Sequence, residues 1–446
     1  MTEPTDLERY PTLSDSGRRM LQRLREHRHA PLFRNQSGNR LQTEDVARVR
    51  AFEHEVIAAT VPDQREDAMP WLPAHIARCY REIPYYRAMG SPPGRLLDIP
   101  TIARADLGQD IARFVPDSAP LDRLINFRTS GTTGHPLLIA SHPVVAASYL
   151  AFHRRALARL GIVLRASGEQ VGVALLGYQR ACFTYVSVTP TQNESGLVKL
   201  NLHPADWRHP DDRRKYLEDL APELLTGDPI SFVALLELGA ELRPRALLST
   251  SMTLLPALRR ELEQAFACPV VDLYSMNEAG PIATFEAARG GHVLLQPGML
   301  VEILDERGQP LARGARGEIS LTGGFNFCLP LLRYRTGDFA SLELISGEPV
   351  LLGLEGRAPV RFRCSDGEWL NNIEVTHALK SFELRQYHLH QAKDGALTLR
   401  VLGVKGREPE LARALETLFG SSQKSEILEL GSAPGKVLQY SSELSS

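Results

Sequence analysis

The sequence has few cysteines, few lysines and no long apolar run. Five cysteines, an odd number, are scattered over 446 residues, which argues against a disulfide framework and against a metal site built from cysteines. No apolar segment approaches the length of a membrane span, and the acidic, polar first residues predict no signal peptide. We therefore expect a cytoplasmic protein without a membrane segment, whose cysteines are small core residues.

An excess of charge of one sign is also missing. Lysine and arginine total 51 residues against 53 aspartates and glutamates, a formal net charge of −2. Binding to nucleic acid or to a membrane surface requires a basic face, so this balance argues against both kinds of partner. Only seven residues are lysines, so a lysine in a chemically suitable place is of particular interest as a functional residue. With 43% apolar residues, the chain can form large cores in more than one domain.

The hydrophobic pattern changes twice along the chain. Residues 1–120 are predicted to be mostly helical. From about 125 to 275, short apolar runs alternate with helical patterns, which indicates parallel strands covered by helices. After Gly280, period-two patterns indicate a β-rich subdomain that closes near Leu354. The expected strands are 171–177, 245–250, 268–274, 299–311 and 316–323, and the expected helices are 232–242 and 254–266.

The C-terminal residues have a pattern of their own, with predicted helices at 371–382 and 407–419 and predicted strands at 383–392 and 396–403. We place the boundary at Gly356-Arg357, which gives an N-terminal domain over 1–355 and a small, mobile C-terminal domain over 356–446. The predicted fold class is α/β. A large domain of mixed and parallel sheets, flanked by helices and carrying a β-rich subdomain, is followed by a small α+β domain.

The strongest local motif is a turn rich in glycine and hydroxyl groups, which follows a short apolar strand. Its glycines let the backbone approach a polyanion, while its hydroxyls and amides can donate hydrogen bonds. It is not a Walker loop, because the lysine is missing. Simple turns also collect such residues, so a plain turn stays open for this motif alone. The residues are Thr129, Ser130, Gly131, Thr132, Thr133 and Gly134, followed by His135 and Pro136.

The second motif, residues 274–281, follows the predicted strand 268–274. Open α/β sheets bind their ligands beyond the carboxyl ends of strands. Tyr274 can present a flat face to a purine, Asn277 can hydrogen-bond a phosphate, and Glu278 can offer Mg²⁺ a hard oxygen ligand. A surface loop in contact with water is the alternative for this segment taken alone.

Two further motifs carry charges that suit a nucleotide. Asp338, in the segment 333–338, can accept both hydroxyls of a ribose, and Arg357 can pair with ribose or phosphate oxygens. Lys436 follows a glycine turn near the C-terminus and can neutralise charge that develops on a phosphate ester. Taken singly, a hairpin end and a solvated lysine explain these residues equally well.

In this order and at these separations, the four motifs resemble the adenylate-forming superfamily of acyl-CoA and aryl-CoA ligases, peptide-synthetase adenylation domains and luciferases. Segments 78–87, 224–238 and 258–281 most resemble the phenylacetate-CoA ligase branch. The resemblance runs from about residue 70 to the end. It implies a ligase that uses ATP and Mg²⁺ to convert a carboxylic acid, preferably an aryl acid, into an acyl-adenylate with release of pyrophosphate. A thiol, of coenzyme A or of the phosphopantetheine on an acyl carrier protein, would then accept the acyl group.

The resemblance also implies a role for each motif residue. Lys436, Glu278 and Asn277 would be catalytic, with Glu278 as the Mg²⁺ ligand. The acyl group would lie against Tyr178, Phe183, Tyr185 and Gly280. The residues that would hold the nucleotide are Thr129, Ser130, Gly131, Thr132, Thr133, Gly134, Ser249, Tyr274, Ser275, Asp338 and Arg357.

Three positions depart from the family pattern. His135 stands where a lysine usually closes the phosphate loop, Asn277 replaces a threonine, and Pro359 lies where a hinge is expected. Proline fixes φ, which argues against a hinge rotation there. These departures leave two alternatives open, transfer to an amine or a degenerate, non-catalytic nucleotide-binding homologue. Folding alone does not require four intact and chemically distinct groups, Glu278, Asp338, Arg357 and Lys436, and this argues against the second alternative.

Overall fold

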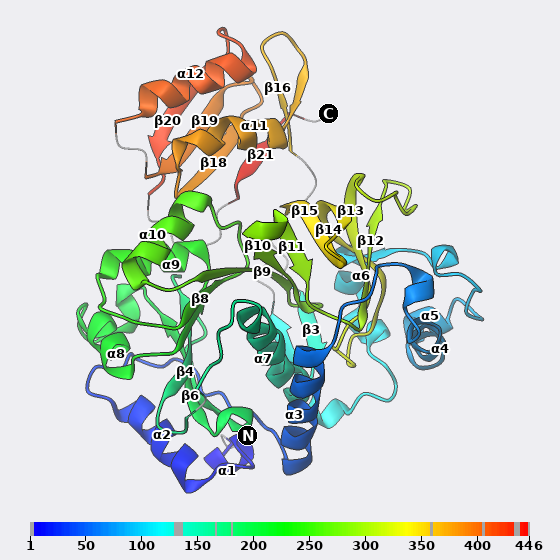
Figure 1. The fold of residues 1–446 in the computed structure, drawn as a ribbon, viewed down its shortest axis with the longest axis vertical. Coiled ribbons are helices and arrows are strands. Elements are labelled where there is room, and N and C mark those ends of the chain that lie inside the picture. Colours follow the sequence, from blue (N-terminus) through cyan, green and yellow to red (C-terminus); the bar gives the residue numbers. More distant parts are fainter. Residues whose placement is uncertain are drawn as a thin grey trace.

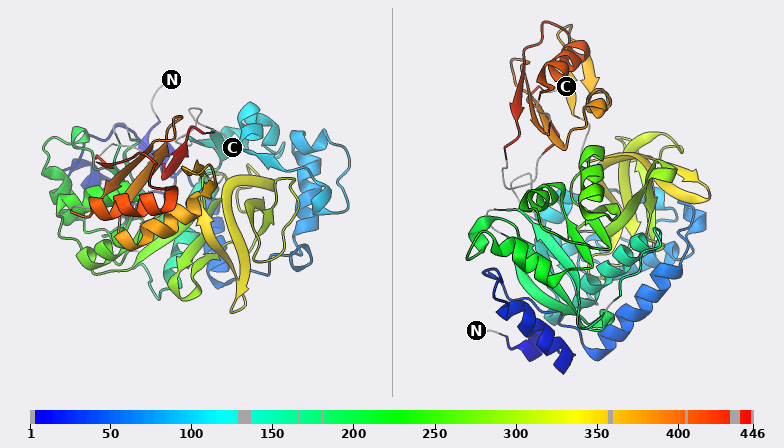
Figure 2. Two further views of the ribbon diagram at one scale, coloured as in Figure 1. Left: turned by 90° about the horizontal axis from the view of Figure 1, so that it is seen from above. Right: turned by 60° about the vertical axis from the view of Figure 1, so that its left-hand side comes forward.

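The computed structural model describes residues 4–128, 137–165, 167–179, 182–356, 360–403, 406–431 and 438–444. The chain forms a large domain and a small C-terminal domain, as predicted (Figure 1). Figure 2 shows the small domain projecting from the body of the large one. Within the described ranges, no helix has both the length and the apolar character needed to cross a membrane.

The described strands of the large domain form a 13-stranded sheet, in the order β12-β13-β14-β15-β11-β10-β9-β8-β7-β4-β6-β5, with β1 beside β14. Strands β6, β4, β7, β8 and β9 pair in parallel, whereas β9 pairs with β10 in antiparallel fashion. Strand β9 therefore joins a parallel half of the sheet to a largely antiparallel half. The strands are β1 (Ile102–Ala103), β4 (Val171–Gly177), β5 (Tyr185–Thr189), β6 (Ser195–Asn201), β7 (Leu224–Gly227), β8 (Ala246–Ser249), β9 (Val270–Met276), β10 (Gly280–Glu286), β11 (Gly291–Leu294), β12 (Met299–Leu304), β13 (Arg316–Gly323), β14 (Leu331–Ile345) and β15 (Glu348–Glu355).

Helices cover the parallel half, as the alternating pattern predicted. The carboxylate of Asp228 caps α9 by accepting a hydrogen bond of 2.8 Å from the Ser231 amide. Gly239 ends this helix, since its φ of +62° lies in the left-handed region that glycine adopts without strain. The helix predicted over 232–242 therefore begins earlier and stops sooner than expected. The helices of this half are α7 (Pro143–Ala158), α8 (Asp212–Leu220), α9 (Pro229–Leu238) and α10 (Pro256–Phe266).

The N-terminal region is mostly helical, as predicted. Ser14 caps α2 by accepting a hydrogen bond from the Gly17 amide, and Met20, Leu21 and Leu24 bury the helix in the same cluster as strands β5 and β6. Helix α3 packs along α7. The helices are α1 (Asp6–Arg9), α2 (Asp15–Glu26), α3 (Thr43–Ala58), α4 (Leu72–Glu82), α5 (Pro84–Arg87) and α6 (Arg104–Gln109).

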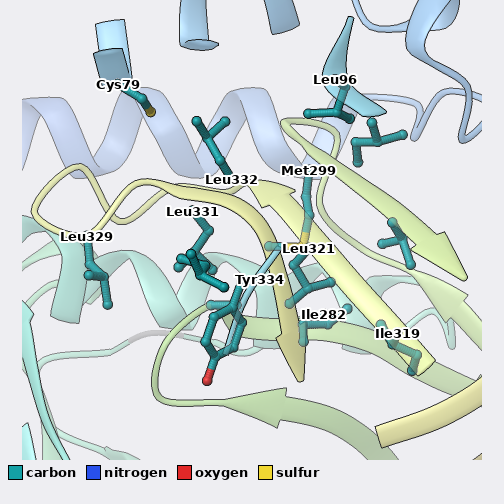
Figure 3. Close-up of a cluster of buried hydrophobic side chains, with 14 of the residues drawn as sticks. Cys79, Leu96, Ile282, Met299, Ile319, Leu321, Leu329, Leu331, Leu332 and Tyr334 are labelled. Atoms are coloured by element: carbon teal, nitrogen blue, oxygen red, sulfur yellow. The ribbon is translucent and has the colours of Figure 1, made fainter. Parts of the chain in front are cut away.

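The antiparallel half encloses a large hydrophobic cluster that includes Ile282, Leu321, Leu331 and Tyr334. Figure 3 shows the Tyr334 ring among these aliphatic side chains, with its hydroxyl oxygen directed away from them. The buried ring thus fixes the direction of one polar atom at the edge of an apolar core.

The C-terminal domain has its own hydrophobic cluster, which extends from Phe362 to Phe419 and Tyr440. Its sheet has the order β20-β19-β18-β21. Two ion pairs join this domain to α10, one between Arg260 and Glu383 at 2.8 Å and one between Arg385 and Glu261. The elements are β16 (Arg361–Arg363), β17 (Trp369–Asn371), α11 (Asn372–Leu379), β18 (Gln386–Gln391), β19 (Leu397–Leu402), α12 (Glu408–Phe419), β20 (Ser425–Glu429) and β21 (Tyr440–Ser442).

Candidate active site

The turn between β9 and β10 lies where the two halves of the sheet meet. The Gln296 side chain holds this turn by donating to the carbonyls of Ala279 at 2.8 Å and Pro281 at 2.7 Å. Gly280 has a φ of +73°, and a Cβ on it would lie 2.5 Å from the Phe325 ring. Both the backbone conformation and the close ring contact therefore require glycine here.

Glu278, in this turn, is buried at 5% exposure, yet its carboxylate has two polar partners. Glu278 Oε1 accepts a hydrogen bond from the Tyr334 hydroxyl at 3.2 Å and lies 3.3 Å from Arg104 Nη1. Burial and the charge of Glu278 raise the pKa of Tyr334 well above its usual value. The phenol therefore stays protonated at neutral pH and keeps donating to the carboxylate.

A second carboxylate, Asp338, has a similar arrangement. The Tyr274 hydroxyl donates a hydrogen bond of 2.7 Å to Asp338 Oδ2, and burial together with that carboxylate raises the pKa of Tyr274 well above its usual value. Asp338 lies in a bulge of β14, where residues 336–338 stand opposite Ile319. The segment 333–338 is thus part of a long strand and not a hairpin end.

The two carboxylates belong to one network. Tyr334, which contacts Glu278, and Asp338, which contacts Tyr274, lie four residues apart on β14. The chain also returns to Asp338 at Gly356, where a Cβ would lie 3.3 Å from Asp338 Oδ1. The structure therefore brings together the second motif and the described part of the third.

The hydroxyl-rich loop lies outside the described residues, as do Arg357 and Lys436. The loop residues concerned are Thr129, Ser130, Gly131, Thr132, Thr133 and Gly134. The strands that flank the loop, β2 (Ile125–Arg128) and β3 (Leu138–Ser141), form an antiparallel hairpin. The Phe127 ring lies 6.2 Å from the Tyr149 ring, whose hydroxyl donates to the Asn277 carbonyl at 3.1 Å. The base of the loop is thus linked through one tyrosine to the turn that carries Glu278.

A row of hydroxyls lies at the carboxyl ends of β8 and β9. Ser275 Oγ and Thr250 Oγ1 are 3.0 Å apart, and Thr250 Oγ1 is 3.2 Å from Ser251 Oγ. Ser249 is buried, and its hydroxyl has no hydrogen-bond partner among the described residues. These groups supply donors and acceptors beside Tyr274.

The residues predicted for the acyl group lie in different surroundings. Tyr178 follows β4 at the carboxyl edge of the sheet, and its ring lies 5.7 Å from the His203 ring. It packs against the hydrophobic cluster that contains Met20, Leu21 and Leu24 of α2. Phe183 is 50% exposed, and its ring lies 5.5 Å from that of Tyr185 on β5. Gly280 lies much closer to the network, beside Phe325 and Tyr149. The pocket that these residues were predicted to form stays a prediction.

The carboxylate of Glu278 suits a magnesium ion. Mg²⁺ in nucleotide sites usually takes one or two carboxylates and completes its shell with water and phosphate oxygens. The described residues contain no group of three or more His, Cys, Asp or Glu side chains placed to hold a metal. A single protein carboxylate therefore suits a magnesium ion whose other ligands are water molecules and phosphate oxygens of a nucleotide.

Three residues of this network carry no signal in the motifs. Arg104 reaches Glu278 because the short strand β1 pairs with β14, with Ile102 opposite Tyr334. Tyr149 lies on α7, 128 residues before its partner Asn277. Tyr334 lies within the third motif, but the bulge at residues 336–338 interrupts the period-two alternation between Tyr334 and Asp338, so strand periodicity does not link the two residues.

Parts of the chain are similar to known proteins. Residues 115–327 match the family of AMP-binding enzymes. A phenylacetate-coenzyme A ligase of Aromatoleum evansii is 24% identical over 401 residues, covering 79% of this chain and 88% of that protein. The protein CapK of Staphylococcus aureus is 24% identical over 261 residues, covering 55% of this chain and 54% of that protein.

The fold is also similar to that of solved enzymes. A 2-hydroxyisobutyryl-CoA ligase in its postadenylation state, in complex with an acyl-AMP, superposes with a TM-score of 0.62 at 16% identity, over 88% of this chain and 89% of that chain. The mixed sheet, the flanking helices and the separate small domain are common to both. Residues 115–327 thus match the family of AMP-binding enzymes, and the chain has the fold of the solved 2-hydroxyisobutyryl-CoA ligase, in agreement with the resemblance of its four motifs to adenylate-forming enzymes.

Proposed function

We propose that this chain is an adenylate-forming ligase that uses ATP to convert a carboxylic acid into an acyl-adenylate and then transfers the acyl group to a thiol. The observation that carries the proposal is the shared network of Glu278, Tyr334, Asp338 and Tyr274, in which one carboxylate suits Mg²⁺ and the other suits a ribose. Folding alone does not require two carboxylates at the edge of an apolar core, because burying a charge has a large free-energy cost.

In the first step, an oxygen of the substrate carboxylate attacks the α-phosphorus of ATP, and the bond to pyrophosphate breaks. Positioning and charge stabilisation are what such a transfer requires from a protein. We assign Tyr274 to the adenine, Asp338 and Arg357 to the ribose, and the hydroxyls and amides of residues 129–134 to the phosphates. Ser249, Ser275 and Asn277 border the nucleotide in this assignment.

Two groups stabilise the developing charge in this proposal. A magnesium ion held by Glu278 supplies Lewis-acid stabilisation of the phosphate oxygens. The ammonium group of Lys436 neutralises the charge on the α-phosphate. The Tyr334 phenol and the Arg104 guanidinium orient the Glu278 carboxylate.

An aryl acid is the substrate class that we favour. The aromatic rings of Tyr149 and Phe325, 5.3 Å apart, flank Gly280 beside the proposed reaction centre. The relative from Aromatoleum evansii is a phenylacetate-coenzyme A ligase, and this supports the same class. Tyr178, Phe183 and Tyr185 remain candidates for the more distant wall of the pocket.

In the second step, a thiolate of coenzyme A or of a carrier-protein phosphopantetheine attacks the acyl carbon and expels AMP. Because ATP and these thiols are available in the cytoplasm, we also propose that location.

The test is pyrophosphate release over a panel of aryl and alkyl acids, measured without an acceptor and with coenzyme A, a phosphopantetheinylated carrier protein or an amine. Acid-dependent release followed by a thioester is the expected result. An amide product would instead establish an amine ligase. No release with any acid, in the presence of measurable ATP binding, would identify a non-catalytic homologue and overturn the proposal.

A further inference from the structure

A single arginine balances the charge of the buried Glu278 carboxylate. Arg104 Nη1 lies 3.3 Å from Glu278 Oε1, and this is the one ion pair that the described part of the chain gives to Glu278. The Tyr334 hydroxyl donates to the same oxygen at 3.2 Å. A carboxylate that has lost most of its hydration is costly without a positive partner, and Arg104 supplies this partner.

The backbone holds Arg104 in place from both sides. Two residues earlier, Ile102 lies opposite Tyr334 in the pairing of β1 with β14, and both are buried in the same hydrophobic cluster. Helix α6 begins at Arg104, and the Ala103 amide before it donates to the Asp106 carboxylate at 2.8 Å. The arginine and the tyrosine therefore approach Glu278 from one connected unit of the fold.

The two oxygens of the Glu278 carboxylate differ in their contacts. The hydrogen bonds from Arg104 and Tyr334 both end on Oε1. Within the described ranges, no hydrogen bond to Oε2 is formed. Because an ionised carboxylate has about four acceptor positions, Oε2 can serve a further ligand while Oε1 keeps its partners.

The two partners of the ion pair also differ in exposure. The Arg104 side chain is 37% exposed, whereas that of Glu278 is 6% exposed. Arginine has a long side chain whose charge is more weakly hydrated than an ammonium group, so it can move between the carboxylate and water. The pair can therefore open from the arginine side, while the carboxylate stays where it is.

We propose that Arg104 is a positioning residue that neutralises Glu278 before the nucleotide arrives, so that this carboxylate takes up Mg²⁺ only together with a nucleotide. The proposal rests on the metal role of Glu278 proposed above. A free divalent cation at Glu278 would be repelled by the positive charge of Arg104. The negative phosphates of a nucleotide offset this repulsion, so Arg104 favours the complex of metal and nucleotide over the free ion.

The test measures the binding of Mn²⁺ alone to the full chain, without nucleotide, by electron paramagnetic resonance. Mn²⁺ prefers the same oxygen ligands as Mg²⁺. Arg104→Gln should bind Mn²⁺ roughly tenfold more tightly than wild type, because the carboxylate has lost its competing positive charge. Arg104→Lys keeps the charge and should stay within about threefold of wild type. Arg95→Gln, which removes an exposed arginine before β1, is the matched control and should bind as wild type does.

Thermal unfolding gives a second readout that does not depend on activity. Arg104→Gln leaves the buried carboxylate without its partner, so its Tm should be lower than that of wild type when a chelator is present. Mn²⁺ should then raise the Tm of Arg104→Gln, since a ligand that binds the folded state stabilises it. The Tm of wild type should not respond to Mn²⁺ alone, and an equal response of both proteins would overturn the inference.

Changes at Glu278 show whether the added binding belongs to this carboxylate. The double variant Arg104→Gln/Glu278→Gln should lose the tighter Mn²⁺ binding, and binding that survives in it would contradict the proposal, as would no gain in Arg104→Gln. A further comparison leaves Arg104 intact. Without nucleotide, wild type and Glu278→Gln should bind Mn²⁺ equally weakly, and clearly tighter binding by wild type would overturn the inference.

The Mg²⁺ dependence of ATP binding in Glu278→Gln separates these failures from a failure of the proposed function. If this dependence is weakened but Arg104→Gln gains no Mn²⁺ binding, the metal role of Glu278 stands and only the role of Arg104 is wrong. If the dependence is unchanged, Glu278 is not the metal ligand and both proposals are wrong.

Discussion

Hydroxyl groups connect polar partners in two regions of this molecule, but the partners differ in kind. In the large domain, the phenols of Tyr334 and Tyr274 donate to the carboxylates of Glu278 and Asp338. In the C-terminal domain, the hydroxyl of Ser441 lies between the imidazoles of His388 and His390. Burial raises the pKa of both phenols well above its usual value, whereas burial lowers the pKa of His388. The phenols of the large domain therefore stay protonated as donors, and the His388 ring resists protonation.

The two regions also differ in how they are supported. The carboxylate network lies on long strands of a 13-stranded sheet and against a large core. Ser441 lies instead on β21, a three-residue edge strand of the C-terminal sheet. We infer that the large domain holds its polar groups in place before binding, while the contacts of this short edge strand can open.

The largest loss of adenylation rate is expected from Lys436→Ala, in the C-terminal domain. A preorganised charge aimed at the reacting phosphate contributes about 2.7–4 kcal/mol, so adenylation should fall roughly a hundred- to a thousandfold. ATP–pyrophosphate exchange measures it, with Lys424→Ala, another lysine of the C-terminal domain, as the matched control. An exchange rate within a few-fold of wild type would remove Lys436 from the mechanism.

The next largest effect is expected from Glu278→Gln. The amide keeps the shape of the side chain but loses the charge that suits Mg²⁺, so kcat should fall roughly a hundredfold. The Mg²⁺ concentration needed for half-maximal ATP binding should rise as well. The exposed Glu306→Gln serves as a control for general charge effects. If the Mg²⁺ requirement does not change, Glu278 is not the metal ligand.

Local patterns predicted the elements of this fold better than they predicted the contacts of its site. The strand predicted at 171–177 has the observed bounds, because a continuous apolar run ending in glycine suits a buried parallel strand. Strands β5, β6 and β7 were not predicted, since they are short and, in β5 and β6, their apolar residues are interrupted by polar ones. The motifs placed Tyr274, Glu278 and Asp338 near one another through a family resemblance and not through periodicity.

The remaining contacts depend on pairings between distant segments. Arg104 meets Glu278, 174 residues away, because β1 pairs with β14. The third motif also contains a residue whose structural role cannot be read from its local sequence. Its first residue, Arg333, is buried and donates to the carbonyls of Ile99 at 2.9 Å and Gly308 at 2.6 Å, so it supports the fold. No local pattern separates this buried structural arginine from the Asp338 carboxylate, to which we assign a role in ribose binding.

A smaller effect is expected from Tyr274→Phe, which removes the hydrogen bond to Asp338 but keeps the ring. A hydrogen bond to a charged group is worth about 1.5–3 kcal/mol, and part of it is regained when water or the ribose replaces the phenol. KM for ATP should therefore rise roughly five- to tenfold, with kcat changed by less than about threefold. Tyr85→Phe, in which the phenol lies outside the network, is the control. An unchanged KM would show that Tyr274 does not orient Asp338.

The smallest effect concerns Asp272, on the strand β9 that carries the site. Asp272 Oδ2 lies 3.6 Å from Arg259 Nη2 and 3.9 Å from His292 Nε2, yet burial raises the pKa of Asp272 to about 6. A carboxyl whose pKa is raised on folding favours the folded state most when it is protonated. This contribution is present below about pH 4 and is lost as the pH rises through 6.

Asp272→Asn should therefore raise Tm by about 1–2 °C above pH 7 and leave it nearly unchanged near pH 4, where the wild-type carboxyl is protonated. Thermal unfolding at both pH values measures the difference, and a lower Tm at pH 8 would mean that the ion pair with Arg259 outweighs the cost of burial. This part of the large domain therefore loses stability as the pH rises, which is opposite to the direction expected from the lowered pKa of His388 in the C-terminal domain.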